Sequence, residues 1–203
     1  MNQYQQYIAL SRYARWIPEL NRRETWNETV NRYMANVVSD KVDKDTYKAL
    51  ENAIYNLKVM PSMRAMMTAG KALDRDNTCG YNCAYLAVDD PKAFDEAAFI
   101  LLCGTGVGFS VERQYISKLP DVPDELFQSD TTIVVSDSKE GWAKALRQLI
   151  SLLYAGEIPK WDTHKVRPAG AKLKTFGGRA SGPEPLEDLF RFTCETFVAA
   201  KGK

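Results

Sequence analysis

The chain has 203 residues, of which 45% are hydrophobic and 26% are charged, and its formal net charge is +1. These ordinary globular values exclude a mainly disordered chain and a strongly basic surface for nucleic acid. No apolar run reaches the roughly 18–20 residues that span a bilayer, and no secretory signal is visible, so we expect a cytoplasmic protein without a membrane partner. We also expect free thiols on the four cysteines, and no metal site because His164 is the single histidine.

Residues 1–60 are predicted to form a helical region. Apolar residues that repeat at helical spacing define one face of a first helix: Trp26, Val30, Tyr33, Met34 and Val37. The same spacing predicts a second helix over 47–57, which Pro61 stops. We therefore predict two domains, a helical region over 1–60 and an α/β region over 61–203.

Residues 61–64 and the region of Gly70 are predicted to be loop, and the apolar run 81–88 to be a buried strand. Asp89-Asp90-Pro91 predicts a helix start, because a carboxylate can cap a helix and proline fits its first turn. The nearly continuous apolar run 94–103 predicts a helix that is buried on more than one face. The glycines of 104–108 are expected to end this helix, and 109–112 to form the next strand.

The proline-rich and acidic segment 117–130 is predicted to be an exposed connection that leads to a strand over 132–135. Asp137 and Glu140 have the spacing of a capping box, and helical periodicity follows over 142–153. Gly156 and Pro159 are expected to end that helix. A loop is predicted over 167–185, with a last helix from about Pro185.

Cys83 follows Asn82 on the predicted buried strand. A cysteine in such a strand is most often an inert core residue, whereas a redox role needs an accessible thiol and a second cysteine. Cys79 is four residues away, but Gly80 between them indicates a turn rather than a redox C-x-x-C motif. A metal site at this pair would lack further ligands.

Two glycine-rich segments could bind a nucleotide. In Gly104-Thr-Gly-Val-Gly108, backbone N–H groups could approach phosphate, although a helix end and a tight turn explain the same glycines. The segment 167–183 combines cations, hydroxyls, a phenyl ring and glycines, which suit a loop that closes on a nucleotide. A solvated surface loop is the alternative for this segment.

Taken in order, seven segments resemble the N-terminal portion of the catalytic chain of the class II, adenosylcobalamin-dependent ribonucleotide reductases. They cover nearly the whole chain: Tyr13–Glu19, Trp26–Val30, Met60–Arg64, Gly80–Tyr85, Gly104–Val111, Glu140–Trp142 and Arg167–Pro183. The resemblance implies an α/β fold in which an N-terminal helical region precedes the first half of a ten-stranded α/β barrel.

The resemblance also implies residue roles. Cys83 is expected to be one of two thiols that form a disulfide as the ribose 2′-OH of the substrate is reduced. The residues expected to line the substrate nucleotide are Ser62, on its phosphates, Asn82 and the backbone of Gly106. The residues expected to contact a dNTP effector are Asp90 and, on a specificity loop, Arg167, Lys172 and Phe176.

The cofactor implied is adenosylcobalamin, bound mainly by parts of the family chain that this sequence lacks. The second redox cysteine and the radical-forming cysteine are missing as well. We therefore expect a C-terminal fragment of the same enzyme and a thioredoxin-like reductant as partners, and triphosphates as substrates. Segment 113–138 is too short for the large insertion of monomeric members, so we expect helices 91–103 and 139–155 to form a homodimer.

Three functions follow as hypotheses. The first is part of an enzyme that makes deoxyribonucleotides for DNA synthesis by thiyl-radical chemistry, in a split or truncated chain. The second is a non-catalytic nucleotide-binding regulatory module, which would bind dNTPs without needing Cys83. The third, a purely structural helical protein, would neither bind nucleotides nor associate, and the glycine-rich segments disfavour it.

Overall fold

The computed structural model describes residues 1–173, 175 and 178–203, and it divides into two compact units. The first unit contains Met1–Asn82, and the second contains Cys83–Leu173 and Gly178–Lys203. The chain passes from one unit to the other between Asn82 and Cys83, because 61–82 pack with the N-terminal helices. The domain boundary expected after residue 60 stays a prediction.

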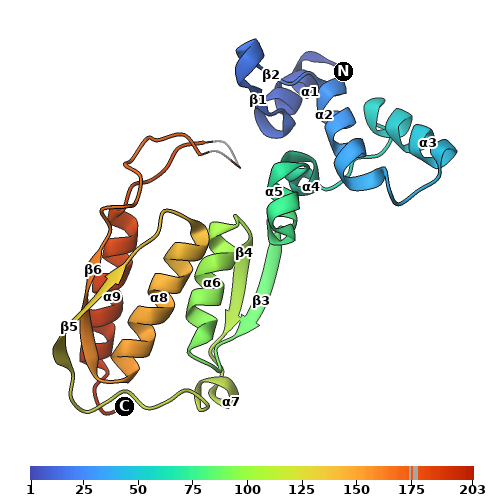
Figure 1. Ribbon diagram of the computed structural model, residues 1–203. Helices are drawn as coiled ribbons and strands as arrows, with labels where there is room; N and C mark the ends of the chain where they lie inside the picture. The colour runs from blue at the N-terminus through green and yellow to red at the C-terminus, as the bar shows by residue number, and fades with distance from the viewer. Residues whose placement is uncertain (174, 176–177) are drawn as a thin grey trace. The chain divides into compact units, whose positions relative to one another are not determined.

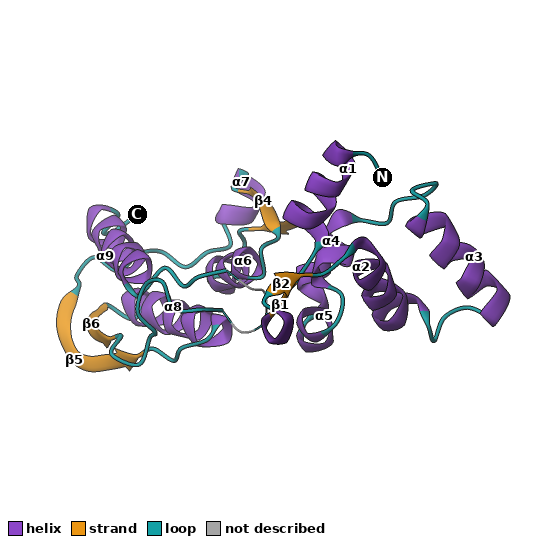
Figure 2. Cartoon of the chain, turned by 90° about the horizontal axis from the view of Figure 1, so that it is seen from above, coloured by secondary structure: helices purple, strands orange, loops and turns teal. Residues whose placement is uncertain are grey.

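The first unit is mainly helical, as predicted for residues 1–60 (Figure 2). Its longer helices start at side-chain caps: Thr25 and Glu28 form a capping box for α2, and Asp43 caps α3. The elements in chain order are α1 (Gln3–Ile8), a π-helical turn (Ala9–Tyr13), β1 (Trp16–Ile17), β2 (Arg22–Arg23), α2 (Trp26–Tyr33), a second π-helical turn (Met34–Val38), α3 (Lys44–Tyr55), α4 (Met63–Thr68) and α5 (Lys71–Arg75).

The predicted apolar faces form the core of the first unit. The buried members of this core are Ala9, Trp26, Val30, Met34, Ile54 and Met66. The indole Nε1 of Trp26 donates to the Tyr55 carbonyl at 3.0 Å, which joins α2 to the end of α3. The loop predicted over 61–64 is wrong from Met63 onward, because Ser62 caps α4 and Met66 from that helix enters the core. The loop predicted at Gly70 is confirmed, since Gly70 lies in a turn between α4 and α5.

A buried ion pair also holds the first unit together. Arg32 donates to both carboxylate oxygens of Glu24, at 2.7 and 2.8 Å, and to the Met66 carbonyl at 2.7 Å. Burial opposes ionisation of Glu24, but hydrogen bonds from Arg32 and from the Arg15 amide outweigh it, so the pKa of Glu24 is lowered. The pair therefore fixes α4 against α2 through charge-assisted contacts.

The second unit consists of two strand–helix–strand motifs and a last helix (Figure 1). In the first motif, β3 (Cys83–Ala87) pairs in parallel with β4 (Gly106–Ser110), and α6 (Lys92–Leu102) connects them. In the second, β5 (Phe127–Val134) pairs in parallel with β6 (Glu157–Asp162) around α8 (Lys139–Tyr154). The short helix α7 (Arg113–Ile116) lies between the motifs in the chain, and α9 (Glu184–Ala199) follows them. Helices α6 and α8 pack side by side.

The core of the second unit lies between α8, α9 and the β5–β6 pair. Its fully buried side chains include Val135, Leu149, Leu153 and Phe190, each 0% exposed. Phe190 packs edge-on against Trp161, with ring centroids 5.6 Å apart. The helical spacing predicted over 142–153 therefore identifies the buried face of α8 correctly.

Four local predictions need correction. The strand predicted over 109–112 begins earlier, at Gly106, so two of the glycines of 104–108 belong to β4. The cap of α8 is Ser138 rather than Asp137, because the Ser138 hydroxyl accepts from the Gly141 amide at 2.9 Å. Helix α6 is not buried on several faces, since its large side chains Phe94, Leu101 and Leu102 are exposed and its main packing partners are β3, β4 and α8.

The fourth correction concerns Pro159, which lies inside β6 rather than in a loop. Proline lacks the N–H that a strand ladder needs. The register shifts at this point, so that Ser129, Asp130 and Thr131 of β5 stand opposite the single residue Pro159. The bulge in β5 thus accommodates the missing donor.

The α/β class is confirmed. The strands of the described residues form three two-stranded sheets, β1–β2, β3–β4 and β5–β6. The first half of a ten-stranded barrel therefore remains a proposal. No helix in the described part of the chain is long and apolar enough to cross a membrane.

Candidate functional site

Cys83 is the first residue of β3, and its side chain is exposed. Its register partner on β4 is Gly106, so no side chain stands beside the thiol on the neighbouring strand. The other three cysteines are less accessible, because Cys79 and Cys103 are buried and Cys194 is half-buried. The inert core interpretation of Cys83 is therefore wrong, and the thiol can be reached by a ligand.

The structure brings Cys83 and Gly106 together, as a shared nucleotide surface requires. Ser62 and Asn82 belong to the first unit, and both are exposed. The Ser62 hydroxyl oxygen accepts a long hydrogen bond of 3.4 Å from the Ala65 amide as the cap of α4. Its hydroxyl proton is left to donate to a ligand such as a phosphate.

Asp90 begins the turn before α6. One of its carboxylate oxygens accepts from the Lys92 amide at 2.8 Å, which confirms the predicted capping role. The neighbouring Asp89 instead pairs with Lys118 at 3.2 Å. Asp90 is exposed, so its remaining oxygen can accept from a ligand hydroxyl.

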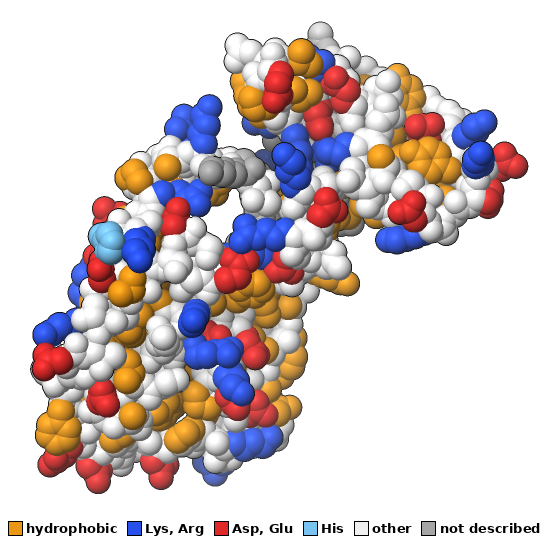
Figure 3. Space-filling model, viewed as in Figure 1, with side chains coloured by type: hydrophobic (Ala, Val, Ile, Leu, Met, Phe, Trp, Pro, Cys, Tyr) orange, Lys and Arg blue, Asp and Glu red, His pale blue; other side chains and the backbone are white. Residues whose placement is uncertain are grey.

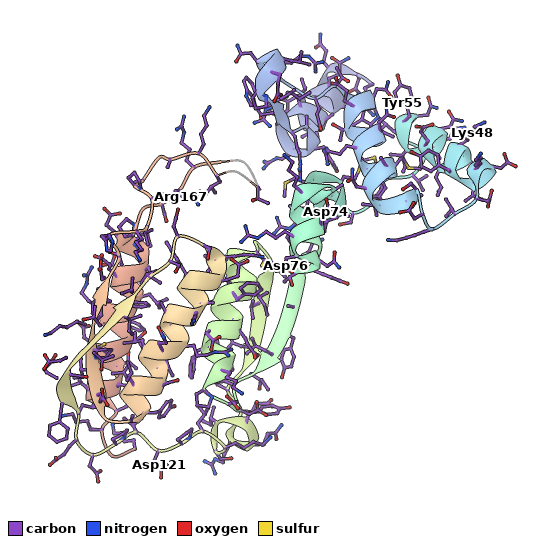
Figure 4. The ribbon with its side chains drawn as sticks, in the orientation of Figure 1. Lys48, Tyr55, Asp74, Asp76, Asp121 and Arg167 are labelled. Carbon is purple, nitrogen blue, oxygen red and sulfur yellow. The ribbon has the colours of Figure 1, made fainter. Side chains whose placement is uncertain are left out.

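Arg167 stands at the base of the glycine-rich loop (Figure 4). Its Nε donates to both carboxylate oxygens of Asp137, at 3.0 and 2.8 Å, and its backbone amide donates to Asp137 at 3.3 Å. Nε is thereby occupied, while the terminal nitrogens of this guanidinium remain for other acceptors.

Beyond Arg167 the loop forms a narrow ladder rather than an irregular coil. Lys172 bridges to Arg179, the Leu173 amide donates to the Gly178 carbonyl at 3.0 Å, and Arg179 donates to the Gly170 carbonyl at 2.8 Å. Lys172 is exposed on this ladder. Phe176, the aromatic residue expected to contact the effector, lies outside the described residues.

Charged and apolar side chains are intermixed over α6 and α8 (Figure 3). Arg147 of α8 donates to Oδ2 of Asp95 on α6, and the nearest contact is 2.7 Å. Asp95 is buried, and its Oδ1 has no hydrogen-bond partner among the described residues. Lys139 lies 3.0 Å from the Cys103 sulfur and 4.6 Å from the Phe99 ring centroid. A hollow of about 430 Å³ runs between the two helices.

The single histidine lies after β6. Its Nδ1 is 2.6 Å from Oδ1 of Asp162, and its backbone amide also donates to that oxygen. The backbone hydrogen bond, and then the contact with the His164 ring, lower the pKa of Asp162. No group of His, Cys, Asp and Glu side chains that could hold a metal ion occurs among the described residues.

Comparison with known proteins identifies the relatives of this chain. The sequence family described as "B12-dependent ribonucleotide reductase, insertion domain" matches residues 112–195. The adenosylcobalamin-dependent ribonucleoside-triphosphate reductase of Lactobacillus helveticus is 28% identical over 251 positions, covering 88% of this chain and 34% of the relative. The enzyme of the same description from Euglena gracilis is 28% identical over 97% of this chain and 30% of its own length.

A solved class II, B12-dependent ribonucleotide reductase superposes with a TM-score of 0.81 and 25% identity, over 97% of this chain and 37% of that one. This chain is related to the class II ribonucleotide reductases. It corresponds to the N-terminal portion of their catalytic chain and spans about a third of the length of the curated relatives. The resemblance drawn from the seven motifs is thereby confirmed.

Segment 113–138 is expected from the sequence to be too short for the large insertion of monomeric members, and this expectation must be narrowed. The match to the insertion-domain family begins at residue 112, so the sequence after Glu112 shares part of that family's pattern. The alignment with the Lactobacillus helveticus reductase nevertheless runs over 251 positions, more than this chain contains, so that relative carries additional residues. Whether a partner copy completes the effector site stays a prediction.

Three features of this ribonucleotide reductase relative escaped the sequence analysis. The Arg167–Asp137 pair joins residues 30 positions apart, and nothing local indicates it. The sequence could have indicated the buried Asp95, because it is a carboxylate within an apolar helical run. Tyr85, two residues beyond Cys83 on the same strand, has an exposed side chain, although the apolar run around it predicts burial.

Proposed function

We propose that this chain supplies the first redox cysteine and part of the nucleotide sites of a ribonucleotide reductase. The enzyme would convert ribonucleoside triphosphates to 2′-deoxyribonucleotides by thiyl-radical chemistry. The observation that carries this proposal is the exposed thiol of Cys83 beside Gly106 on an open strand pair. The named activity of the relatives supports the substrate class.

The chemistry assigned to Cys83 is a two-electron reduction. The C2′–OH bond of the ribose breaks and a C2′–H bond forms, while Cys83 and a second cysteine lose two hydrogens and become a disulfide. The oxygen leaves as water, so the atoms balance. Cys83 suits this role because a strand holds its backbone and its sulfur remains accessible. We place the second cysteine outside this chain.

On the resemblance, three further residues would hold the nucleotide. Ser62 would donate its hydroxyl proton to the phosphates, and Asn82 offers an exposed amide one residue before Cys83. The backbone of Gly106 would approach the sugar, because a residue without a side chain allows close contact.

A second nucleotide, the dNTP effector, would bind near the start of α6 and the glycine-rich loop. Asp90 keeps one oxygen for a ribose hydroxyl, and Lys172 is exposed on the loop ladder. Arg167 can offer its terminal nitrogens to a phosphate while Nε stays with Asp137. Phe176 is proposed on the resemblance alone.

Adenosylcobalamin is proposed as the cofactor, and when bound it supplies the radical chemistry. Four hollows among the described residues measure about 260 to 450 Å³. Pockets for drug-sized ligands are about 300–1,000 Å³, and a corrin with its nucleotide arm is larger than such ligands. The described residues therefore do not fit this group by themselves, and we assign them no step of radical formation.

The remaining partners follow from the same proposal. Exposed Phe94, Leu101 and Leu102 on α6 support association of α6 and α8 with another copy of the chain. A C-terminal part of the enzyme would complete the barrel, and a thioredoxin-like reductant would return the disulfide to two thiols.

The test is turnover in an assembly of this chain with its C-terminal complement, adenosylcobalamin and a dithiol. We expect ribonucleoside triphosphate to yield deoxynucleotide, Cys83→Ser to abolish product, and the control Cys194→Ser to retain it. Nucleotide binding should survive Cys83→Ser. Product formation by Cys83→Ser at the wild-type rate would reject the redox role, and effector binding without any turnover would favour a regulatory module.

A further inference from the structure

The face of the β3–β4 pair that carries Cys83 also carries Tyr85. Side chains two positions apart on a strand project from the same face, and their Cα atoms are about 6.6 Å apart. Tyr85 is 65% exposed, and its side chain makes no hydrogen bond and no ring–ring contact among the described residues. Single exposed aromatic residues are common, so exposure alone decides nothing.

Gly108 supplies the independent observation. It is the register partner of Tyr85 on β4, just as Gly106 is the partner of Cys83. Its φ is not positive, and a Cβ built on it would come no closer than 3.8 Å to any atom, the Ala84 carbonyl oxygen. Neither backbone conformation nor packing within the described chain therefore requires glycine at this position.

Glycine inside a strand is destabilising and often marks a place where a ligand or another backbone comes close. The bare backbone at Gly106 and Gly108 leaves space directly beside the thiol and the phenol ring. The half-buried Ala84 and Leu86 alternate with them and project from the opposite face. Room and an aromatic surface thus occur together on the face of the proposed redox cysteine.

We propose that Tyr85 is a substrate-binding residue whose ring stacks on the nucleobase, with Gly108 leaving the space that the base occupies. The inference rests on the proposed function, which places the ribose at Cys83. A nucleotide is long enough to present its sugar to Cys83 and its base one strand pleat further on. Stacking on an aromatic ring tolerates every base, so the contact would serve all ribonucleotide substrates.

The test measures KM and kcat of the assembled reductase for purine and pyrimidine ribonucleoside triphosphates. Tyr85→Leu should raise KM about tenfold or more, as expected for the loss of one base–aromatic stacking contact. Tyr85→Phe should behave like wild type, because the ring is retained. Gly108→Ala should raise KM without lowering the thermal unfolding midpoint.

Phe109→Leu is the matched control. Phe109 is 63% exposed and follows Gly108 on β4, so its ring projects from the opposite face. The Phe109→Leu substitution should leave KM unchanged. An unchanged KM in Tyr85→Leu overturns the inference, and so does a Tyr85→Phe variant as impaired as Tyr85→Leu, which would implicate the hydroxyl instead.

Direct binding separates this inference from the proposed function. In a Cys83→Ser assembly, radiolabelled ribonucleotide should bind, and adding Tyr85→Leu should weaken that binding about tenfold or more. If the wild type reduces nucleotides and Tyr85→Leu binds them normally, only this inference fails. If the wild type neither binds nor reduces ribonucleotides, the proposed function fails and this inference fails with it.

Discussion

Arg167 and Asp137 tie the start of the glycine-rich loop to the segment that leads into α8. Arg167 makes three hydrogen bonds to one carboxylate, two through Nε and one through its backbone amide. Both side chains are about one-third exposed, at 29% and 34%. The pair is therefore partly screened by solvent, and its value lies in fixing where the loop begins.

Asp137→Asn should loosen that loop. The variant keeps one acceptor but loses the charge, so the unfolding free energy should fall by about 0.5–1 kcal/mol, less at high salt. Amide hydrogen exchange should quicken at Gly170 and Ala180, which hold the loop ladder. The control is Asp130→Asn, since Asp130 is fully exposed opposite Lys160 and should cost almost nothing. Equal effects of the two substitutions would contradict this assignment.

Arg147→Ala should destabilise the protein more than Asp95→Ala. Removal of the arginine leaves a buried carboxylate whose Oδ1 already lacks a partner, whereas removal of the aspartate leaves an arginine side chain that is 46% exposed. In urea unfolding, we expect the unfolding free energy to fall by about 3 kcal/mol in Arg147→Ala and by about 1 kcal/mol in Asp95→Ala. The opposite order of the two losses would contradict this account of the pair.

Glu28 predicts a specific pH dependence. The Arg22 guanidinium, and then the Thr25 amide and hydroxyl, lower the pKa of Glu28 to about 2 from 4.5. Because the folded pKa lies below the unfolded one, the stabilisation is present above pH 4.5 and is lost as the pH falls towards about 2. The difference in thermal midpoint between wild type and Glu28→Gln should therefore vanish near pH 2. In an Arg22→Ala background the same substitution should have much less effect, and a difference independent of pH would contradict the prediction.

Gly141→Ala should destabilise the start of α8, although alanine is normally the better helix former by about 1 kcal/mol. A Cβ at this position would lie 2.5 Å from the Ser136 carbonyl oxygen, a backbone atom that cannot simply turn away. We expect the free energy of unfolding, measured with urea, to fall by about 1–3 kcal/mol. Gly108→Ala, with 3.8 Å of clearance, is the matched control and should change little. A stabilised Gly141→Ala would show that the turn before α8 can move.

The sequence predicts well those features that depend on local periodicity. The buried face of α8, the strand at Cys83 and the cap at Asp90 all follow from side-chain spacing within one element. Contacts between residues far apart in the chain could not be predicted from local side-chain spacing. The pairing of Arg167 with Asp137 depends on two parallel strands that bring their ends together, and Pro159 is compatible with β6 only because β5 bulges opposite it.

The candidate site shows the same division. Exposure of Cys83 could not be predicted, because an apolar strand indicates burial without showing which face is covered. Helix α6 covers one face of β3 and β4, and this arrangement leaves the other face with the thiol accessible. Resemblance to a family predicts a role for this residue, whereas packing determines its accessibility.

The two strand–helix–strand motifs have a consequence for how the protein forms during synthesis. Cys83 pairs with Gly106 and Phe127 pairs with Glu157, so each parallel pair closes over only some 23 to 30 residues. Short closure distances carry a small loop entropy and favour fast pairing. Each motif can therefore assemble soon after it leaves the ribosome, and the open thiol-bearing strand would be in place before the second motif is complete.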